Sequence, residues 1–341
     1  MEFAKRISLL GTETAFEVLA KAQALERTGK EIIHLEIGEP DFDTPEHIKA
    51  AAVQAIADGQ TKYPPVDGTA GLKQAVIDKF QRDNGLDYDL DQILVSAGGK
   101  QSFYNLAQAL LDEGDEVIIP APYWVSYPDM VLLADGKPVI VSAGIEQNFK
   151  LQPEQLEAAI TDKTRLLVLN SPSNPTGVSY RRAELEALAD VLLRHPHVLI
   201  ATDDMYEHIL WTDEPFCNIV TVCPALYART IVLNGVSKAH SMTGWRIGYA
   251  AGPASLIKAM KKVQSQSTSG ACSIAQAAAQ AALEGEQQCV VDMVHAFKER
   301  HDWLLDALNA LPGVTCLPSD GTFYAFPDMR DAMKTLGCSD D

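Results

Sequence analysis

The sequence predicts an α/β fold built on a mostly parallel sheet. Short apolar runs alternate with longer amphipathic stretches through the middle of the chain, as expected for strands joined by crossover helices. Turn-forming residues separate these segments at 114–115, 135–136 and in the Pro-rich run 171–177. With 341 residues, 47% of them hydrophobic, the chain can bury a sizeable core and form about two domains.

The expected elements follow in chain order. Strand candidates are the short apolar runs at residues 93–96, 116–119, 138–142, 166–169, 198–201, 230–233 and 246–251. Helical periodicity lies between most of them, at residues 101–111, 127–134, 153–160 and 181–193. Longer helical patterns then appear at 273–283 and 286–310, where Pro312 and Gly313 end the second one. Two short strand candidates, 314–317 and 322–326, follow.

This change of pattern predicts the domain organisation. Residues 46–285 are expected to form a large domain, and residues 286–341 to begin a smaller α+β domain. The N-terminal segment 1–45 is expected to join the smaller domain. No obvious closing element follows before the printed sequence stops, so the smaller domain is expected to be truncated at its C-terminal end.

The charge balance argues against two classes of partner. The chain carries 28 Lys and Arg against 46 Asp and Glu, a net charge of −18. Such a chain repels phosphate backbones and anionic membrane surfaces, so neither a nucleic acid nor a membrane is expected as its main partner. A small basic pocket for one anionic ligand remains compatible with this charge.

The cysteines, histidines and N-terminus predict a cytoplasmic protein without a metal site. The six cysteines form no C-x-x-C pair and are read as reduced thiols. The first residues lack an uninterrupted apolar segment, so a signal peptide is not expected, and no run of about 18 apolar residues occurs. H-E-x-x-H is absent, and the eight histidines are scattered.

Several nucleotide-binding and hydrolase motifs fail at specific positions. Residues 96–101 approach a P-loop, but Leu94 stands where its first glycine belongs and Gln101 replaces its Ser or Thr. The dinucleotide fingerprint G-x-G-x-x-G is absent. Residues 235–239 approach a nucleophile elbow, but Ala239 occupies the last glycine position. These failures leave a different set of residues to explain.

The most specific signal is a lysine that follows an apolar strand candidate. Residues 234–238 read NGVSK and residues 241–249 read SMTGWRIGY, a run that resembles the Schiff-base lysine segment of class I/II (fold-type I) aminotransferases, which use pyridoxal 5′-phosphate (PLP). The resemblance implies that Lys238 carries PLP and that Ser237 and Arg246 grip its phosphate. A desolvated lysine is a good nucleophile and proton carrier, and a guanidinium binds phosphate in bidentate fashion.

Two further runs match the same family. In ATDDMY at 201–206, the resemblance implies that Asp203 pairs with the pyridine nitrogen and keeps it protonated, so that the ring acts as an electron sink. Tyr206 would donate to the phenolic oxygen of the ring. The run NSPSNPTG at 170–177 is similar to the family's N-P-x-N-P-T-G segment, in which Asn174 would bond the same oxygen. Lys238, Asp203 and Tyr206 are therefore the expected catalytic residues.

The remaining matches concern the phosphate, the ring and the substrate. In the turn at 96–101, the resemblance implies phosphate contacts from Gly99 and Lys100 at a helix N-terminus. Trp124, in the run 122–127, would stack on the ring, and Tyr63 would reach the phosphate from the partner subunit of a homodimer. Gly38, in GEPDF, would contact the substrate carboxylate through its backbone. The expected substrate-binding residues are Gly38, Trp124, Asn174 and Lys100.

The resemblance implies a PLP-dependent fold-type I transferase fold and transamination in two half-reactions. A lysine after the double glycine is characteristic of aspartate-using members, so Lys100 favours aspartate as the amino donor and 2-oxoglutarate as the 2-oxo acid. Lys238 would move the proton between the substrate Cα and the cofactor as general base and acid. Another PLP chemistry on the same scaffold, such as β-elimination, remains open at this point.

A second alternative is a PLP-binding protein that does not catalyse transamination. Family members carry an arginine near their C-terminal end that clamps the substrate α-carboxylate, and no arginine follows Arg330 in the printed sequence. A fragment without this clamp is expected to retain PLP binding better than turnover. A transcriptional regulator of this fold is disfavoured by the acidic charge and by the lack of a basic helix-turn-helix segment before residue 39.

Overall fold

The computed structural model describes residues 1–11 and 14–338. At its centre is a seven-stranded sheet in the order β1-β7-β6-β5-β4-β2-β3. The strands are β1 (Ile93–Ser96), β2 (Glu116–Ala121), β3 (Lys137–Ser142), β4 (Thr164–Asn170), β5 (Leu199–Asp203), β6 (Thr230–Gly235) and β7 (Gly248–Ala251). All neighbours pair in parallel except β7, which is antiparallel to β1 and β6. The prediction of a mostly parallel sheet is confirmed.

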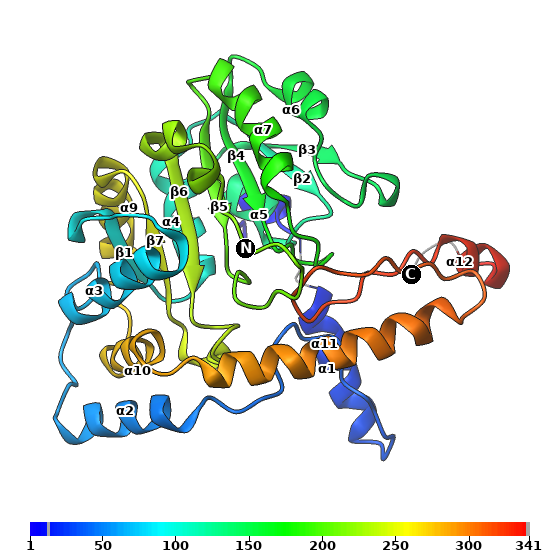
Figure 1. The fold of residues 1–341 in the computed structure, drawn as a ribbon, viewed down its shortest axis with the longest axis horizontal. Coiled ribbons are helices and arrows are strands. Elements are labelled where there is room, and N and C mark those ends of the chain that lie inside the picture. Colours follow the sequence, from blue (N-terminus) through cyan, green and yellow to red (C-terminus); the bar gives the residue numbers. More distant parts are fainter. Residues whose placement is uncertain (12–13, 339–341) are drawn as a thin grey trace.

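Helices cover both faces of this sheet (Figure 1). The helices of the described chain are α1 (Thr14–Glu26), α2 (Glu46–Ala57), α3 (Ala70–Lys79), α4 (Gly99–Leu110), α5 (Ser126–Leu133), α6 (Pro153–Ala159), α7 (Arg182–Arg194), α8 (Ile219–Val222), α9 (Ala254–Ser267), α10 (Ser273–Glu284), α11 (Gln288–Asn309) and α12 (Arg330–Leu336). Strand residues alternate between the two cores: Leu167 and Leu169 pack with α2, α3, α7 and α10, whereas Leu166 and Val168 pack with α4, α5 and α9.

A separate apolar cluster forms where α11 meets the loop after β5. Tyr206 and Ile209 from that loop pack there against Met293 and Phe297 of α11. In Figure 1 the chain turns after α11 and returns toward the sheet. This return brings Phe323 and Tyr324 into the same cluster. The domain limits at residues 45 and 285 stay a prediction.

The two strand candidates at 314–317 and 322–326 are wrong. In the part of the chain that the structure describes, this segment makes only the isolated bridges Thr315↔Asp328 and Leu210↔Gly321. Thr322 has a φ of 67°, which interrupts an extended strand. The backbone bonds the loop after β5 instead, with Trp211 N donating to Asp320 O at 3.0 Å and Thr322 N to Ile209 O at 2.8 Å.

The strand expected at 246–251 begins later than predicted. Arg246 has a left-handed φ of 55° and lies in the turn before β7, which starts at Gly248. Arg246 therefore does not pair with the neighbouring strands, and its side chain contacts the loops at the ends of the strands instead. None of the helices in the described ranges is long and apolar enough to cross a membrane.

Candidate active site

The carboxyl ends of three parallel strands bring the predicted reactive residues together. β4 ends at Asn170 and β5 at Asp203, and β6 ends at Gly235, shortly before Lys238. Ligands of open α/β sheets bind at this edge, because the loops that follow parallel strands converge there. Asn170 Nδ2 donates to Asp203 O at 2.9 Å, which ties the first two loops to each other.

Lys238 has the environment of a nucleophilic amine. Its Nζ donates to the backbone oxygen of Gly38 at 2.7 Å, so the N-terminal segment lies against the site. Burial lowers the pKa of Lys238 to about 8; Arg246 also lowers it, whereas Glu39 and Asp203 oppose the shift. A larger fraction of this amine is therefore neutral near pH 7 than for an ordinary lysine, as attack on a carbonyl carbon requires.

Asp203 is a partly buried carboxylate with few donors. Tyr127 Oη donates to its Oδ2 at 2.5 Å, and Met205 N donates to its Oδ1 at 3.3 Å. Burial raises the pKa of Asp203, against the opposing effects of Tyr127, Met205 N and the Lys238 charge. A protonated ring nitrogen beside this carboxylate would offset its desolvation, so Asp203 fits the role of partner to the PLP pyridine.

Tyr206 is held by a second tyrosine from the segment after α11. The two hydroxyl oxygens of Tyr206 and Tyr324 are 2.6 Å apart, and their ring centroids are 5.7 Å apart at 70°. Phe323 packs on both rings, at 5.8 Å from Tyr206 and 4.9 Å from Tyr324. Burial raises the pKa of Tyr206, so its hydroxyl is protonated and can donate at neutral pH.

Arg246 and the N-terminus of α4 form a site suited to a phosphate. Its Nη1 donates to Thr243 O at 3.0 Å, and its Nη2 lies 3.5 Å from Ala97 O, just before α4. Gly98 has a φ of 91°, and a Cβ there would lie 2.3 Å from Arg246 Nη2. Gly98 thus lets the guanidinium approach backbone N–H groups at the start of the helix, an arrangement that binds anions.

Ser237, Gly99 and Asn174, which are also predicted to bind the cofactor, lie next to these residues. Ser237 is buried beside Lys238 in the chain, and Gly99 begins α4. A Cβ on Gly248 would lie 2.4 Å from Gly99 N, so β7 packs directly on this turn. The backbone N of Asn174 donates to Asn170 Oδ1 at 2.7 Å, which connects Asn174 to the end of β4.

Trp124, Lys100 and Tyr63 lie further from the reactive residues. Trp124 packs edge-on against Tyr127, with ring centroids 5.2 Å apart, and Lys100 Nζ lies 5.3 Å from the Trp124 ring centroid. Trp124 is therefore one aromatic contact away from Asp203. Tyr63 is 97% exposed, so this chain does not bring it into its own site.

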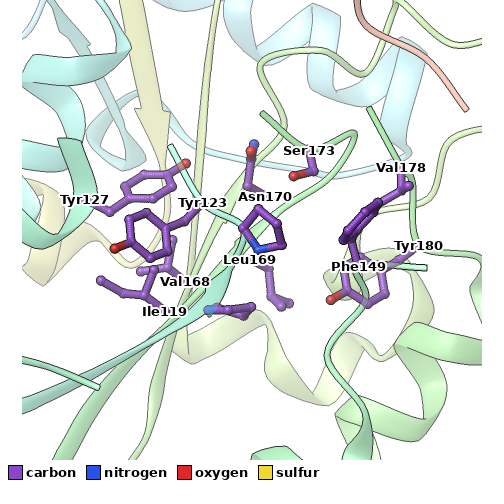
Figure 2. A pocket seen from close by; sticks show the side chains of 12 residues that line it. Ile119, Tyr123, Tyr127, Phe149, Val168, Leu169, Asn170, Ser173, Val178 and Tyr180 are labelled. Atoms are coloured by element: carbon purple, nitrogen blue, oxygen red, sulfur yellow. The ribbon is translucent and has the colours of Figure 1, made fainter. Parts of the chain in front are cut away.

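A small cavity is lined in part by Tyr127 and Asn170, which both hydrogen-bond Asp203. Figure 2 shows Tyr123 and Tyr127 on one side of it and Phe149 and Tyr180 on the other, with Asn170 at its rim. Its volume of about 20 Å³ accommodates one water molecule and is far too small for an amino acid. We therefore assign it to packing beneath the site and not to substrate binding.

The sequence predicts no role for Tyr127, Asn170 or Tyr324. Both Tyr127 and Asn170 stand inside the motifs at 122–127 and 170–177, and the position of the polar Asn170 directly after an apolar strand candidate is an available signal. Tyr324 lay in a segment expected to be a strand, and no local pattern connects it to Tyr206. Among the residues that the structure describes, no group of three or more His, Cys, Asp or Glu side chains could hold a metal ion.

Comparison with known sequences identifies similar proteins over nearly the whole chain. The profile of the family "Aminotransferase class I and II" matches residues 30–337. The chain is 58% identical to the aspartate/prephenate aminotransferase of Nitrosomonas europaea over 98% of this chain and 85% of that protein. It is 50% identical to the aspartate aminotransferase of Geobacillus stearothermophilus over 99% of this chain and 86% of that protein.

Solved structures give the same result for the fold. The aspartate aminotransferase of Rhizobium meliloti superposes with a TM-score of 0.94 at 50% identity, over 97% of this chain and 83% of that one. The Thermus thermophilus aspartate aminotransferase with maleate gives a TM-score of 0.92 at 42% identity, over 99% of this chain and 90% of that one. The loops described above therefore belong to a fold seen in fold-type I enzymes.

Proposed function

Since the chain belongs to the class I and II aminotransferase family, we propose that it binds PLP through Lys238 and transfers the amino group of aspartate to 2-oxoglutarate. The observation that carries this proposal is the meeting of Lys238, Asp203 and Arg246 at the carboxyl ends of the parallel strands. They supply an amine with a lowered pKa, a partly buried carboxylate and a guanidinium at a helix N-terminus. These groups match the aldehyde, the ring nitrogen and the phosphate of PLP.

The residues present divide the work of the reaction. When bound, PLP supplies an electron sink for the charge left as the substrate α-proton is removed. Arg246, Ser237 and the start of α4 would hold the phosphate, and Asp203 would keep the ring nitrogen protonated. Lys238 Nζ, once the substrate amine has displaced it, would carry the proton from the substrate Cα to the cofactor, first as general base and then as general acid. The lowered pKa of Lys238 allows both roles near neutral pH.

Substrate choice rests on the carboxylates of the substrate. The exposed ammonium of Lys100 lies beside Trp124 and would attract a second, distal carboxylate, which aspartate has and alanine lacks. Gly38, Trp124, Asn174 and Lys100 are the proposed substrate contacts. The Thermus thermophilus relative is described with maleate, also a dicarboxylate, which supports this preference.

We further propose a cytoplasmic homodimer. All six cysteines are free in the structure, which agrees with a reducing compartment. Tyr63, exposed on this chain, would reach the phosphate of the partner subunit's site. A dimer formed in this way would share each active site between two chains.

The test of the function is product analysis on the purified protein supplied with PLP. Aspartate and 2-oxoglutarate should give glutamate and oxaloacetate in equal amounts, and alanine should react more slowly than aspartate. Release of pyruvate and ammonia from a β-substituted amino acid, without glutamate formation, would support β-elimination instead. That alternative is disfavoured, because relatives at 50% and 58% identity are named aminotransferases.

A further inference from the structure

The segment after α11 delivers one residue directly to the active site. It is fixed to the loop after β5 by the Leu210↔Gly321 bridge, and Gly321 N also donates to Gly177 O at 3.0 Å. The fully buried Thr322 then reverses the chain, and its Oγ1 accepts from Tyr324 N at 3.2 Å. Tyr324 is therefore anchored by backbone contacts, and its hydroxyl is directed to a fixed place.

That place is the hydroxyl of Tyr206. The two oxygens are 2.6 Å apart, so one hydroxyl donates and the other accepts. Each hydroxyl has a single hydrogen. If Tyr206 donated to Tyr324, it would have no hydrogen left for another acceptor. If Tyr324 donates, the hydrogen of Tyr206 is free to point elsewhere in the site.

Gly38 shows how closely this pair is packed. A Cβ at Gly38 would lie 2.7 Å from Tyr324 Oη, closer than real Cβ atoms approach, and 3.1 Å from its Cε1, which is a tight contact. The backbone oxygen of the same residue accepts from Lys238 Nζ. Gly38 therefore contacts both Tyr324 and the reactive lysine, and a side chain at this position would displace the Tyr324 hydroxyl.

We propose that Tyr324 is a positioning residue: its hydroxyl donates to Tyr206 and thereby directs the Tyr206 hydrogen to the phenolic oxygen of PLP. The proposal rests on the proposed function, because the acceptor belongs to the cofactor. It also gives the segment after α11 a role in the chemistry as well as in packing. Other ionisable groups near Tyr206 are Asp203 and Tyr127.

The test is a pH titration of the visible absorption band of the PLP-loaded protein, comparing Tyr324→Phe with the unaltered chain. A weaker donor to the phenolic oxygen stabilises its deprotonated form less, so the titration midpoint should rise by about half a pH unit. The value of kcat should fall several-fold with little change in KM for aspartate. Glu39, Asp203 and Arg246, the charged groups near Lys238, are unchanged in this variant.

Tyr180→Phe is the matched control. Tyr180 is also buried, and its hydroxyl accepts from Leu151 N at 2.8 Å. This hydrogen bond involves neither Tyr206 nor Lys238. Its loss should leave the midpoint unchanged. A midpoint in Tyr324→Phe equal to that of the unaltered chain would overturn the positioning role while leaving the proposed function intact. An unaltered protein that shows no visible band with PLP would overturn both.

Gly38→Ala gives a second, independent measurement. The added methyl group should displace the Tyr324 hydroxyl and raise the midpoint in the same direction. In the Tyr324→Phe background, where no hydroxyl remains, it should add little further shift. A Gly38→Ala shift of equal size in both backgrounds would show that the midpoint does not depend on the Tyr324 hydroxyl, and would contradict the proposal.

Discussion

Asp203 and Asp204 are neighbours in the chain, yet their surroundings give them different chemistry. Asp203 faces Tyr127 and the charge of Lys238, whereas Asp204 is 1% exposed and accepts from Thr202 Oγ1 at 2.6 Å and from Asn218 Nδ2. Burial raises the pKa of Asp204 to about 8, aided by the charge of Glu207. Asp204 is therefore mostly neutral at pH 7 and serves as a structural hydrogen-bonding group.

This contrast predicts opposite results for two matched substitutions. Asp203→Asn keeps the size of the side chain but removes the charge that would hold the PLP ring nitrogen protonated, so kcat should fall by about 10²–10³-fold. Asp204→Asn replaces a mostly neutral acid by a neutral amide and should leave kcat within a few-fold of the unaltered value. Steady-state kinetics checks both, and equal losses in the two variants would contradict the assignment.

The Asp204 pKa also predicts how stability depends on pH. Its folded pKa of about 8 lies above the ordinary value of 3.8, so the folded state holds a proton that the unfolded state releases. This contribution is full below about pH 4 and is lost as the pH rises to about 8. Between about pH 4 and pH 8, the free energy of unfolding measured with urea should therefore fall less steeply in Asp204→Asn than in the unaltered chain. The two slopes should differ by up to about 1.4 kcal/mol per pH unit.

Lys238 supplies the most direct residue-level prediction. Lys238→Ala removes both the nucleophile and the proton carrier, so turnover should fall by about 10⁴-fold or more. The Arg246 site is untouched, so PLP binding by equilibrium dialysis should remain detectable. Lys258→Ala, an exposed position on α9, is the control and should keep full activity. Retention of activity in Lys238→Ala would refute its role.

At the scale of elements, a buried ionic network joins α3 to the active-site loops. Lys79, 0% exposed, pairs with Glu207, the residue after Tyr206. Glu207 also accepts from Asn84 Nδ2 and from Asn234 Nδ2, both at 2.6 Å. Because Asn234 belongs to β6, the loop bearing Tyr206 and the strand leading to Lys238 are held by one carboxylate.

Breaking this pair should be costly because it leaves a charge buried without its partner. Lys79→Met should lower the free energy of unfolding by about 3–5 kcal/mol, and adding Glu207→Gln should recover a large part of the loss. Lys298→Met, which breaks the exposed pair with Asp302, should change it by less than about 0.5 kcal/mol. Urea denaturation of Lys79→Met, Glu207→Gln, the double variant and Lys298→Met measures the coupling. Additive effects of the two buried substitutions would contradict it.

The sequence was informative where local pattern determines structure. The sequence predicts every central strand, but the ranges 166–169 and 198–201 end before Asn170 and Asp203, because an apolar run does not extend to the polar residues that close β4 and β5. The candidates at 314–317 and 322–326 failed for a different reason. In the second candidate, Phe323 and Tyr324 pack onto the cluster around Tyr206, a partner more than a hundred positions away in the chain. In the first candidate, Thr315 makes an isolated bridge to Asp328.

For the whole molecule, the shared site proposed for the dimer can be tested by mixing inactive chains. Tyr63→Ala should weaken PLP binding in the partner subunit's site, and Lys238→Ala should inactivate its own. In a mixed dimer, the chain with Lys238 receives Tyr63 from its partner, so one site of the two is intact. Random reassortment should therefore restore about a quarter of the unaltered activity. No recovery in a confirmed mixed dimer would contradict a shared site.

The central claim, that this chain is an aminotransferase acting through Lys238, is tested most directly by the visible absorption spectrum of the PLP-loaded protein before and after aspartate alone. The band of Lys238-bound PLP should disappear, the absorption of the amino form of the cofactor should grow, and 2-oxoglutarate should reverse the change. A band that neither aspartate nor glutamate alters would contradict it.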